Sequence, residues 1–147
     1  MTAGPASGAF EGREHVLPVR VYYEDTDFTG VVYHAAYLRY LERGRTEFLR
    51  SLGVHHSELL GGDNPTAFAV TAMSMRWLRP ARVDDALEVR TTYDTPRGPR
   101  MTVGQRITRG DDLLLTAEVE AVCITPDGRA KRPPKGLVEA IRPMLRP

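Results

Sequence analysis

The sequence contains a single cysteine, Cys123, which excludes an intramolecular disulfide and is typical of a protein in a reducing compartment. It has no apolar run near the roughly 18 residues of a membrane-spanning helix, and no apolar segment after the start that would mark a secretory signal. We therefore expect a cytoplasmic protein without a membrane span. The chain also lacks an excess of charge of one sign, because the formal net charge is +1. This balance argues against a protein that coats nucleic acid.

Several motifs of common enzymes are absent too. There is no G-x-S-x-G sequence of serine hydrolases, no Walker loop and no G-x-G-x-x-G dinucleotide loop. His55, His56, Glu58 and Asp63 could be drawn as a metal site, but no spacing forces these side chains together. We therefore expect neither a metal nor another cofactor. The 147 residues, 41% of them hydrophobic, fit one domain with its own core.

The longest helical pattern lies between Val21 and Gly53. Its apolar stripe recurs at steps of three and four residues, at Tyr37, Leu41, Gly44, Phe48 and Leu52. The opposite face is charged. A glycine inside a helix costs about 1 kcal/mol relative to alanine, so we expect another backbone to come close at Gly44. Gly53 is expected to end the helix as the residue after its C-cap.

An acidic turn precedes this helix, with three acids and then two turn residues: Glu24, Asp25, Asp27, Thr29 and Gly30. A helix start exposes unpaired N–H groups and the positive end of the helix dipole. If the turn brings Asp27 beside the N–H groups near Tyr33 and His34, two catalytic parts lie together. Asp27 supplies a carboxylate that attacks the substrate or activates water, and the N–H groups supply donors for an oxyanion. Clustered acids repel, which predicts a raised pKa for this carboxylate. The alternative is that Asp25 or Asp27 merely caps the helix or the turn.

The rest of the chain predicts strands. Residues 1–14 are expected to form a flexible tail, and a strand over His15–Tyr23 leads into the acidic turn. Four further strands with turn-rich connectors are expected to meander as antiparallel neighbours, over 67–78, 87–93, 101–107 and 113–124. The first of them changes its alternation near Ala72–Met73, which indicates a bulge. This order predicts an α+β domain over 15–135, with a curved antiparallel sheet wrapped around one long central helix. A C-terminal extension follows over 136–147, with a short helical turn over 138–141.

Three stretches together resemble a known family: YYEDTDFTGVVYHAAYLRYLERGRTEFL, MRWLRPARVDDALEV and VCITPDGRAKRPP. They are similar to the hotdog-fold acyl-CoA thioesterases of the 4-hydroxybenzoyl-CoA thioesterase type. Within this type they most resemble the YbgC-like proteins associated with the Tol–Pal system. The resemblance covers about residues 15–135, and its first stretch is the most specific. It implies a hotdog fold and hydrolysis of an acyl-CoA to a free acid and coenzyme A, which is part of the substrate rather than a cofactor.

The resemblance also implies roles for single residues. Asp27 corresponds to the family's catalytic carboxylate, and the backbone N–H of His34 or its neighbours to the group that polarises the thioester carbonyl. The His34 side chain matches a histidine at the active site of YbgC-like members. Gly30, Val31 and Tyr33 are expected to contact the substrate, although core packing is an equal alternative for Tyr33.

Three basic residues, Arg129, Lys131 and Arg132, are the candidates for binding the coenzyme A nucleotide near a dimer interface, or else form a solvated tail. Glu42 corresponds to the catalytic acid of another hotdog branch, but we expect it to form a helix-surface ion pair. Pro80–Ala81 matches a structural corner of the family. The resemblance further implies a homodimer or a homotetramer.

Several alternatives stay open at this point. The acyl group, the choice between nucleophile and general base for Asp27, and the carrier, coenzyme A or acyl carrier protein, are not readable from the residues. A hydratase on the same fold would need a different motif. A non-enzymatic protein that binds an acyl thioester or acyl carrier, as a scaffold of the cell-envelope machinery, is the alternative function.

Overall fold

The computed structural model describes residues 4–147, so the first three residues of the expected tail lie outside it. The elements follow in chain order: β1 (Ala9–Glu11), β2 (Glu14–Arg20), the 3-10 helix η1 (Tyr23–Asp25), α1 (His34–Ser51), α2 (His56–Gly61), β3 (Ala67–Trp77), β4 (Ala86–Asp94), β5 (Arg100–Arg109), β6 (Asp112–Ile124), α3 (Lys135–Ile141), η2 (Arg142–Met144) and β7 (Leu145–Arg146). One helix dominates, as the periodicity predicts.

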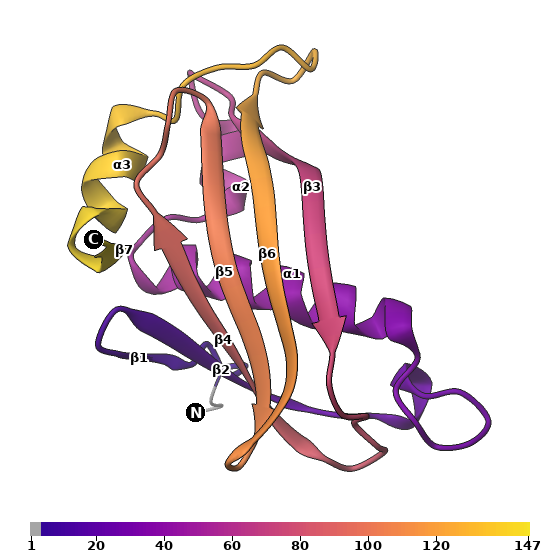
Figure 1. Ribbon diagram of the computed structural model, residues 1–147. Coiled ribbons are helices and arrows are strands. Elements are labelled where there is room, and N and C mark those ends of the chain that lie inside the picture. The colour runs from indigo at the N-terminus through magenta and orange to yellow at the C-terminus, as the bar shows by residue number, and fades with distance from the viewer. Residues whose placement is uncertain (1–3) are drawn as a thin grey trace.

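The strands form one sheet in the order β1-β2-β4-β5-β6-β3, and the short β7 pairs with β4. All pairs are antiparallel except β4–β7. Figure 1 shows the twisted sheet with α1 crossing behind its strands. The α+β class and the hotdog arrangement of a curved sheet around one long helix are therefore confirmed.

The expected meander is wrong for β3. This strand pairs with β6, with Ala67 opposite Ile124 and Trp77 opposite Leu115, and does not pair with β4. The cause lies in residues 78–85, where the Asp84 N–H donates to the Val21 carbonyl at 2.9 Å and so ties this connector to the end of β2. As a result β4 starts beside β2, and β3 is left at the far edge of the sheet. Its register shifts between Val70 and Ala72, which confirms the bulge.

The two ends of the chain belong to the domain more closely than the sequence predicts. Within the tail, Ala9–Glu11 forms β1 and pairs with β2, so the flexible tail is wrong for this part. The extension packs on the core through Leu137 and Ile141, which are 4% and 0% exposed. The expected short helical turn is present as α3. Apolar contact and pairing of β7 with β4 therefore hold the C-terminus in place.

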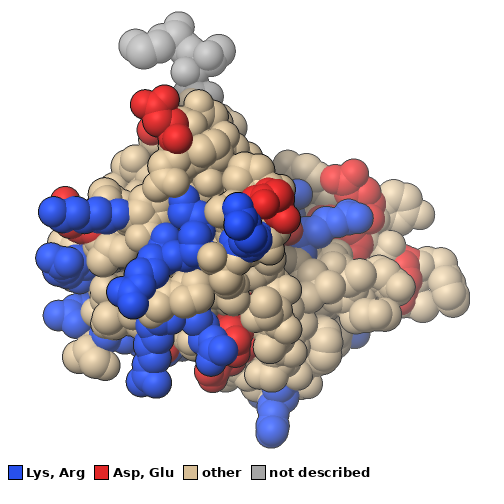
Figure 2. Space-filling model, turned by 90° about the horizontal axis from the view of Figure 1, so that it is seen from above, with Lys and Arg blue, Asp and Glu red and all other residues tan. Residues whose placement is uncertain are grey.

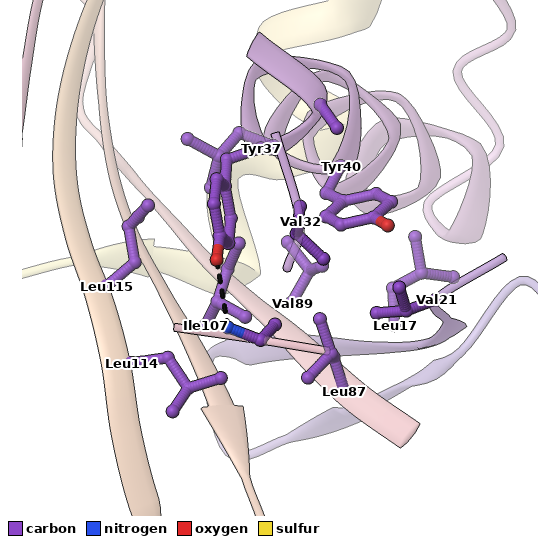
Figure 3. Close-up of a cluster of buried hydrophobic side chains, with 13 residues drawn as sticks. Leu17, Val21, Val32, Tyr37, Tyr40, Leu87, Val89, Ile107, Leu114 and Leu115 are labelled. Atoms are coloured by element: carbon purple, nitrogen blue, oxygen red, sulfur yellow. Dashed lines mark hydrogen bonds between the residues drawn. The ribbon is translucent and has the colours of Figure 1, made fainter. Parts of the chain in front are cut away.

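The apolar stripe of α1 packs against the sheet as predicted. Figure 3 shows Tyr37 and Tyr40 among the leucines and valines of the main core cluster. At Gly44 the close neighbours are side chains rather than a backbone, because an added Cβ would lie 2.6 Å from Val89 Cγ1 and 2.8 Å from Thr91 Oγ1. Gly53 has a φ of +82° after the end of α1, which confirms its place beyond the C-cap.

Candidate active site

The acidic turn folds back on the residues that start α1. The Asp27 N–H donates to the Val31 carbonyl at 2.9 Å, and the Tyr33 N–H donates to the Asp25 carbonyl at 2.9 Å. Gly30 closes the turn with a φ of +82°, in the left-handed region that favours glycine. The sequence DFTGV thus forms a tight loop that holds Asp27 beside the approach to the helix.

The Asp27 carboxylate is exposed and bonded within its own turn. Its Oδ1 accepts hydrogen bonds from the Thr29 Oγ1 at 2.6 Å and from the Thr29 N–H at 2.8 Å. These bonds stabilise the ionised form and lower the pKa of Asp27, so the raised pKa expected from clustered acids is wrong. The Oδ2 atom accepts no hydrogen bond within residues 4–147, which leaves it open toward a ligand.

Neither acid caps α1. Asp25 Oδ2 accepts from the Tyr22 N–H at 2.9 Å and so serves the 3-10 helix η1 instead. The N-cap of α1 is Tyr33, which makes no side-chain capping bond. The Ala36 N–H donates to the Tyr33 carbonyl at 2.8 Å, whereas the N–H groups of His34 and Ala35 find no acceptor among the described residues. The helix start therefore presents two unpaired donors, which is the electrostatic arrangement of an oxyanion site.

A cavity of about 290 Å³ lies beside these donors. Its lining comes from the helix start and from the chain after β3, at Val31, Val32, His34, Tyr37, Trp77, Leu78, Arg79 and Pro80. The rings of Tyr37 and Trp77 stand edge to face, with centroids 6.5 Å apart. The Tyr33 ring packs on that of His34 at 4.4 Å. The lining is mostly apolar and suits an acyl group whose carbonyl points at the helix start.

The buried Ala81 fixes the wall of this cavity. Its N–H donates to the Tyr37 hydroxyl at 3.0 Å, the dashed line in Figure 3, and its carbonyl accepts from the Val32 N–H at 2.9 Å. The Val83 N–H also donates to the Gly30 carbonyl at 3.0 Å. The segment after β3 is thus bonded to both the turn and the helix start, consistent with a structural corner at Pro80–Ala81.

The structure brings five predicted residues together in one loop and helix start: Asp27, Gly30, Val31, Tyr33 and His34. The predicted nucleotide-binding residues lie elsewhere. Their loop follows the end of β6 that pairs with Ala67, at the start of β3, whereas the cavity lies at the Trp77 end of β3. Ten residues of strand separate these two ends of β3, or about 33 Å. Figure 2 views the molecule from above, the side on which the 125–134 loop lies in Figure 1, and shows many Lys and Arg side chains on this face.

Two of the three basic residues already have partners. The Lys131 ammonium donates to Asn64 Oδ1 at 2.6 Å and to Thr66 Oγ1 at 2.8 Å, and so holds the connector before β3. Arg129 is paired with Asp127 at 3.1 Å. Arg132 is exposed and forms no ion pair within residues 4–147. Of the three, Arg132 has the guanidinium that is most available to a phosphate.

Several residues of the cavity are not predicted from the sequence, and two of them carry polar groups. The sequence places Tyr37 only in the apolar stripe, yet its hydroxyl reaches the corner. A tyrosine in such a stripe is a usable signal, because a buried hydroxyl needs a partner. Arg79 lines the cavity and pairs with Asp112 at 3.1 Å. Nothing in the local pattern around Arg79 marks it.

Two features of the described residues concern the expected absences. Across residues 4–147, no group of three or more His, Cys, Asp or Glu side chains is placed to hold a metal ion, and the cofactor-free reaction stays a prediction. No helix of the described chain has the length and apolar character needed to cross a membrane.

Fold, turn and helix start together define a hotdog thioesterase domain, and comparison with known proteins agrees. The chain belongs to the Thioesterase-like superfamily, whose profile matches residues 21–141. The acyl-CoA thioester hydrolase YbgC of Escherichia coli O6:H1 is 43% identical over 125 residues, which cover 84% of this chain and 90% of the relative.

Two more relatives are similar over most of the chain. The acyl-CoA thioesterase YbgC of Haemophilus influenzae is 42% identical over 74% of this chain and 79% of its own length. The crystal structure of a probable thioesterase from Bartonella henselae superimposes with a TM-score of 0.80 and 41% identity, covering 82% of this chain and 99% of that one.

Proposed function

We propose that this protein hydrolyses acyl-CoA thioesters to a free carboxylic acid and coenzyme A in the cytoplasm. The observation that carries the proposal is the turn that bonds the backbone of Asp27, an exposed and ionised carboxylate, to Val31, a few residues before the two unpaired N–H groups that start α1. Relatives at 43% and 42% identity that are named acyl-CoA thioester hydrolase and acyl-CoA thioesterase support it.

The thioester carbonyl oxygen points at the N–H groups of His34 and Ala35, which stabilise the oxyanion that forms when the carbonyl carbon becomes tetrahedral. Such donors typically contribute about 3 kcal/mol each to the transition state. The acyl group lies against Val31, Tyr37 and Trp77 in the cavity. Gly30 and Tyr33 shape the entrance, and the His34 ring lies at its edge.

Asp27 acts in one of two ways. As a nucleophile, its carboxylate oxygen bonds to the carbonyl carbon, the C–S bond breaks, and coenzyme A leaves as a thiolate that takes up a proton; water then hydrolyses the mixed anhydride. As a general base, Asp27 removes a proton from the attacking water and passes it to the leaving sulfur. The lowered pKa keeps Asp27 ionised at neutral pH, which both routes need. A single turnover in ¹⁸O water tests the nucleophilic route: label in the Asp27 carboxylate shows that water attacked the Asp27 carbon of a mixed anhydride. Label in the product acid alone fits both routes, because water can also attack the acyl carbon of the anhydride, and capture of the anhydride with hydroxylamine then separates them.

The coenzyme A nucleotide binds across a dimer. The long edge strand β3 has no partner on its outer side in the described chain, and it exposes Val70 and Trp77 by about half. Pairing with the β3 of a second copy, antiparallel, would cover this edge. It would also bring the 125–134 loop of the partner to the Trp77 end of this chain. Arg129, Lys131 and above all Arg132 then meet the phosphates of a substrate bound in the other subunit.

Release of free thiol from a panel of acyl-CoAs, short, long and aromatic, tests the function. We expect turnover of at least one class by the purified protein, and the preferred class identifies the acyl group that lies against Val31, Tyr37 and Trp77. Thioesters of acyl carrier protein belong in the same panel, because this protein is the alternative to coenzyme A as the carrier of the acyl group. A protein that binds these thioesters and hydrolyses none of them would contradict the proposal and favour a binding or scaffold role.

A further inference from the structure

A second cavity, of about 240 Å³, lies between the C-terminal half of α1 and the sheet. Its walls are largely apolar and include Leu49, Phe68, Val70, Met101 and Val103. It is separate from the helix start, since Arg45 in its lining follows His34 by eleven residues, about 16 Å along the helix axis. The proposed reaction uses none of its residues.

A largely buried charged group, Arg45, lies among these apolar walls. The Arg45 side chain is largely buried, and its Nη1 donates to Gln105 Oε1 at 2.9 Å. Gln105 is itself fixed, because its Nε2 donates to the Leu41 carbonyl at 2.8 Å and to Thr91 Oγ1 at 3.0 Å. The guanidinium is therefore held in position by the helix and the sheet together.

Arg45 forms no salt bridge within residues 4–147. Burial without a paired carboxylate destabilises the charged form and lowers the pKa of Arg45, although the group stays charged at neutral pH. Glu42, one turn earlier on α1, also lines the cavity but is exposed and outside salt-bridge distance. A guanidinium has five N–H donors in a planar fork, and only one bond of this fork is made within the described chain. The unused donors are suited to a bound carboxylate.

We propose that this cavity binds a carboxylate that carries a short apolar group, with Arg45 as its anchor. The guanidinium pairs with both carboxylate oxygens, and the apolar part packs on Phe68, Met101 and Val103. Burial lowers the pKa of His56, so this imidazole is neutral at pH 7 and adds a hydrogen-bonding group without a second charge. The small, apolar interior excludes a nucleotide diphosphate, and Arg45 excludes a cation.

Thioester hydrolysis releases such a carboxylate, the free acid, and in this respect the inference rests on the proposed function. Recognition of the free acid would make the cavity a product site.

Titration of the whole protein with benzoate, followed by calorimetry or NMR, tests the site, with uncharged benzamide as the matched ligand. We expect benzoate to bind, benzamide to bind more weakly, and Arg45→Gln to weaken benzoate at least about tenfold. Arg39→Gln removes an exposed arginine of the same helix outside this cavity, and should bind benzoate as the wild type does. Leu60→Trp narrows the mouth from an exposed position on α2, and should also weaken binding without touching the core.

The inference is overturned if benzoate and benzamide bind alike, if neither of them binds, or if Arg45→Gln binds benzoate as the wild type does. Because benzoate binding needs no turnover, a protein that binds benzoate through Arg45 but hydrolyses no thioester contradicts the proposed function and leaves this site standing.

Discussion

At the scale of single residues, the carboxylate of Asp27 is distinguished from its acidic neighbours by what it bonds. Asp25 turns back to the Tyr22 N–H, while Asp27 is held by Thr29 with one oxygen open. The motif predicts Asp27 as the catalytic carboxylate, but the pKa of Asp27 depends on its hydrogen bonds to Thr29 rather than on the sequence spacing of the acids. That is why a prediction from spacing gives the wrong direction for the pKa of Asp27.

The role of the His34 N–H as an oxyanion donor can be tested directly, because His34 is the first residue of α1. Proline is tolerated at this position and removes the N–H donor together with the imidazole, and the extended Tyr33, with φ −67° and ψ 137°, can precede a proline. We expect His34→Pro to fold and to lose about a hundredfold in kcat. His34→Ala keeps the donor, and its smaller loss measures the ring alone. Equal activity of the two variants in a thiol-release assay would exclude the His34 N–H as an oxyanion donor.

At the scale of elements, α1 was the part most readily predicted, because its stripe repeats over five turns and ends at Gly53. The position of β3 was not, since its partner is set by hydrogen bonds of residues 78–85 to Val21 and Val32, which no local alternation encodes. The same bonds bring Trp77 and Pro80 to the helix start. Half of the cavity therefore could not be derived from the motif.

The Tyr37 hydroxyl connects α1 to the corner after β3, and its removal should affect stability and activity together. In Tyr37→Phe the buried Ala81 N–H loses its acceptor, which costs about 1–3 kcal/mol. We expect a lower midpoint in urea unfolding and a reduced kcat/KM. Tyr23→Phe, which removes a hydroxyl from an exposed ring outside the cavity, is the control. An unchanged midpoint in Tyr37→Phe would show that this bond does not hold the corner.

The buried His15 ties β2 to the segment before β1 and to the end of α1, and it predicts a pH-dependent stability. Its Nε2 donates to the Ser7 carbonyl at 2.8 Å and lies 3.1 Å from Ser51 Oγ, and its Nδ1 has no partner among the described residues. Burial lowers the pKa of His15 below the 6.5 of an exposed histidine. The unfolded chain then binds more protons below pH 6.5, so the free energy of unfolding falls as the pH drops toward the folded pKa, by at most about 1.4 kcal/mol per unit.

Urea unfolding at pH 7.5 and pH 5.5 measures this contribution. His15→Gln keeps an amide donor for Ser7 but cannot titrate, so its stability should depend less on pH than that of the wild type. His56, whose pKa burial also lowers, contributes to the same slope, and His56→Gln separates its share. If His15→Gln has the wild-type slope, His15 is not the group that titrates.

At the scale of the whole molecule, we propose that a second chain completes the site, because the loop that carries Arg132 and the turn that carries Asp27 lie near opposite ends of β3. Mixing two variants tests this. In a mixed dimer of Asp27→Asn and Arg132→Glu chains, one site carries both changes and the other carries neither. After unfolding and refolding together, two weakly active variants should therefore regain about a quarter of the wild-type sites. Sites built within one chain would regain nothing on mixing.

The measurement that tests the central claim most directly is kcat/KM for acyl-CoA hydrolysis by Asp27→Asn. The substitution keeps the size of the side chain and removes both the nucleophile and the base, while Asp111→Asn alters an exposed acid in the β5–β6 turn as a control. We expect a loss of at least about a hundredfold in Asp27→Asn, with unfolding like that of the wild type, and no loss in the control. An Asp27→Asn variant as active as the wild type would contradict the account, because the hydrolysis would then occur elsewhere on the molecule.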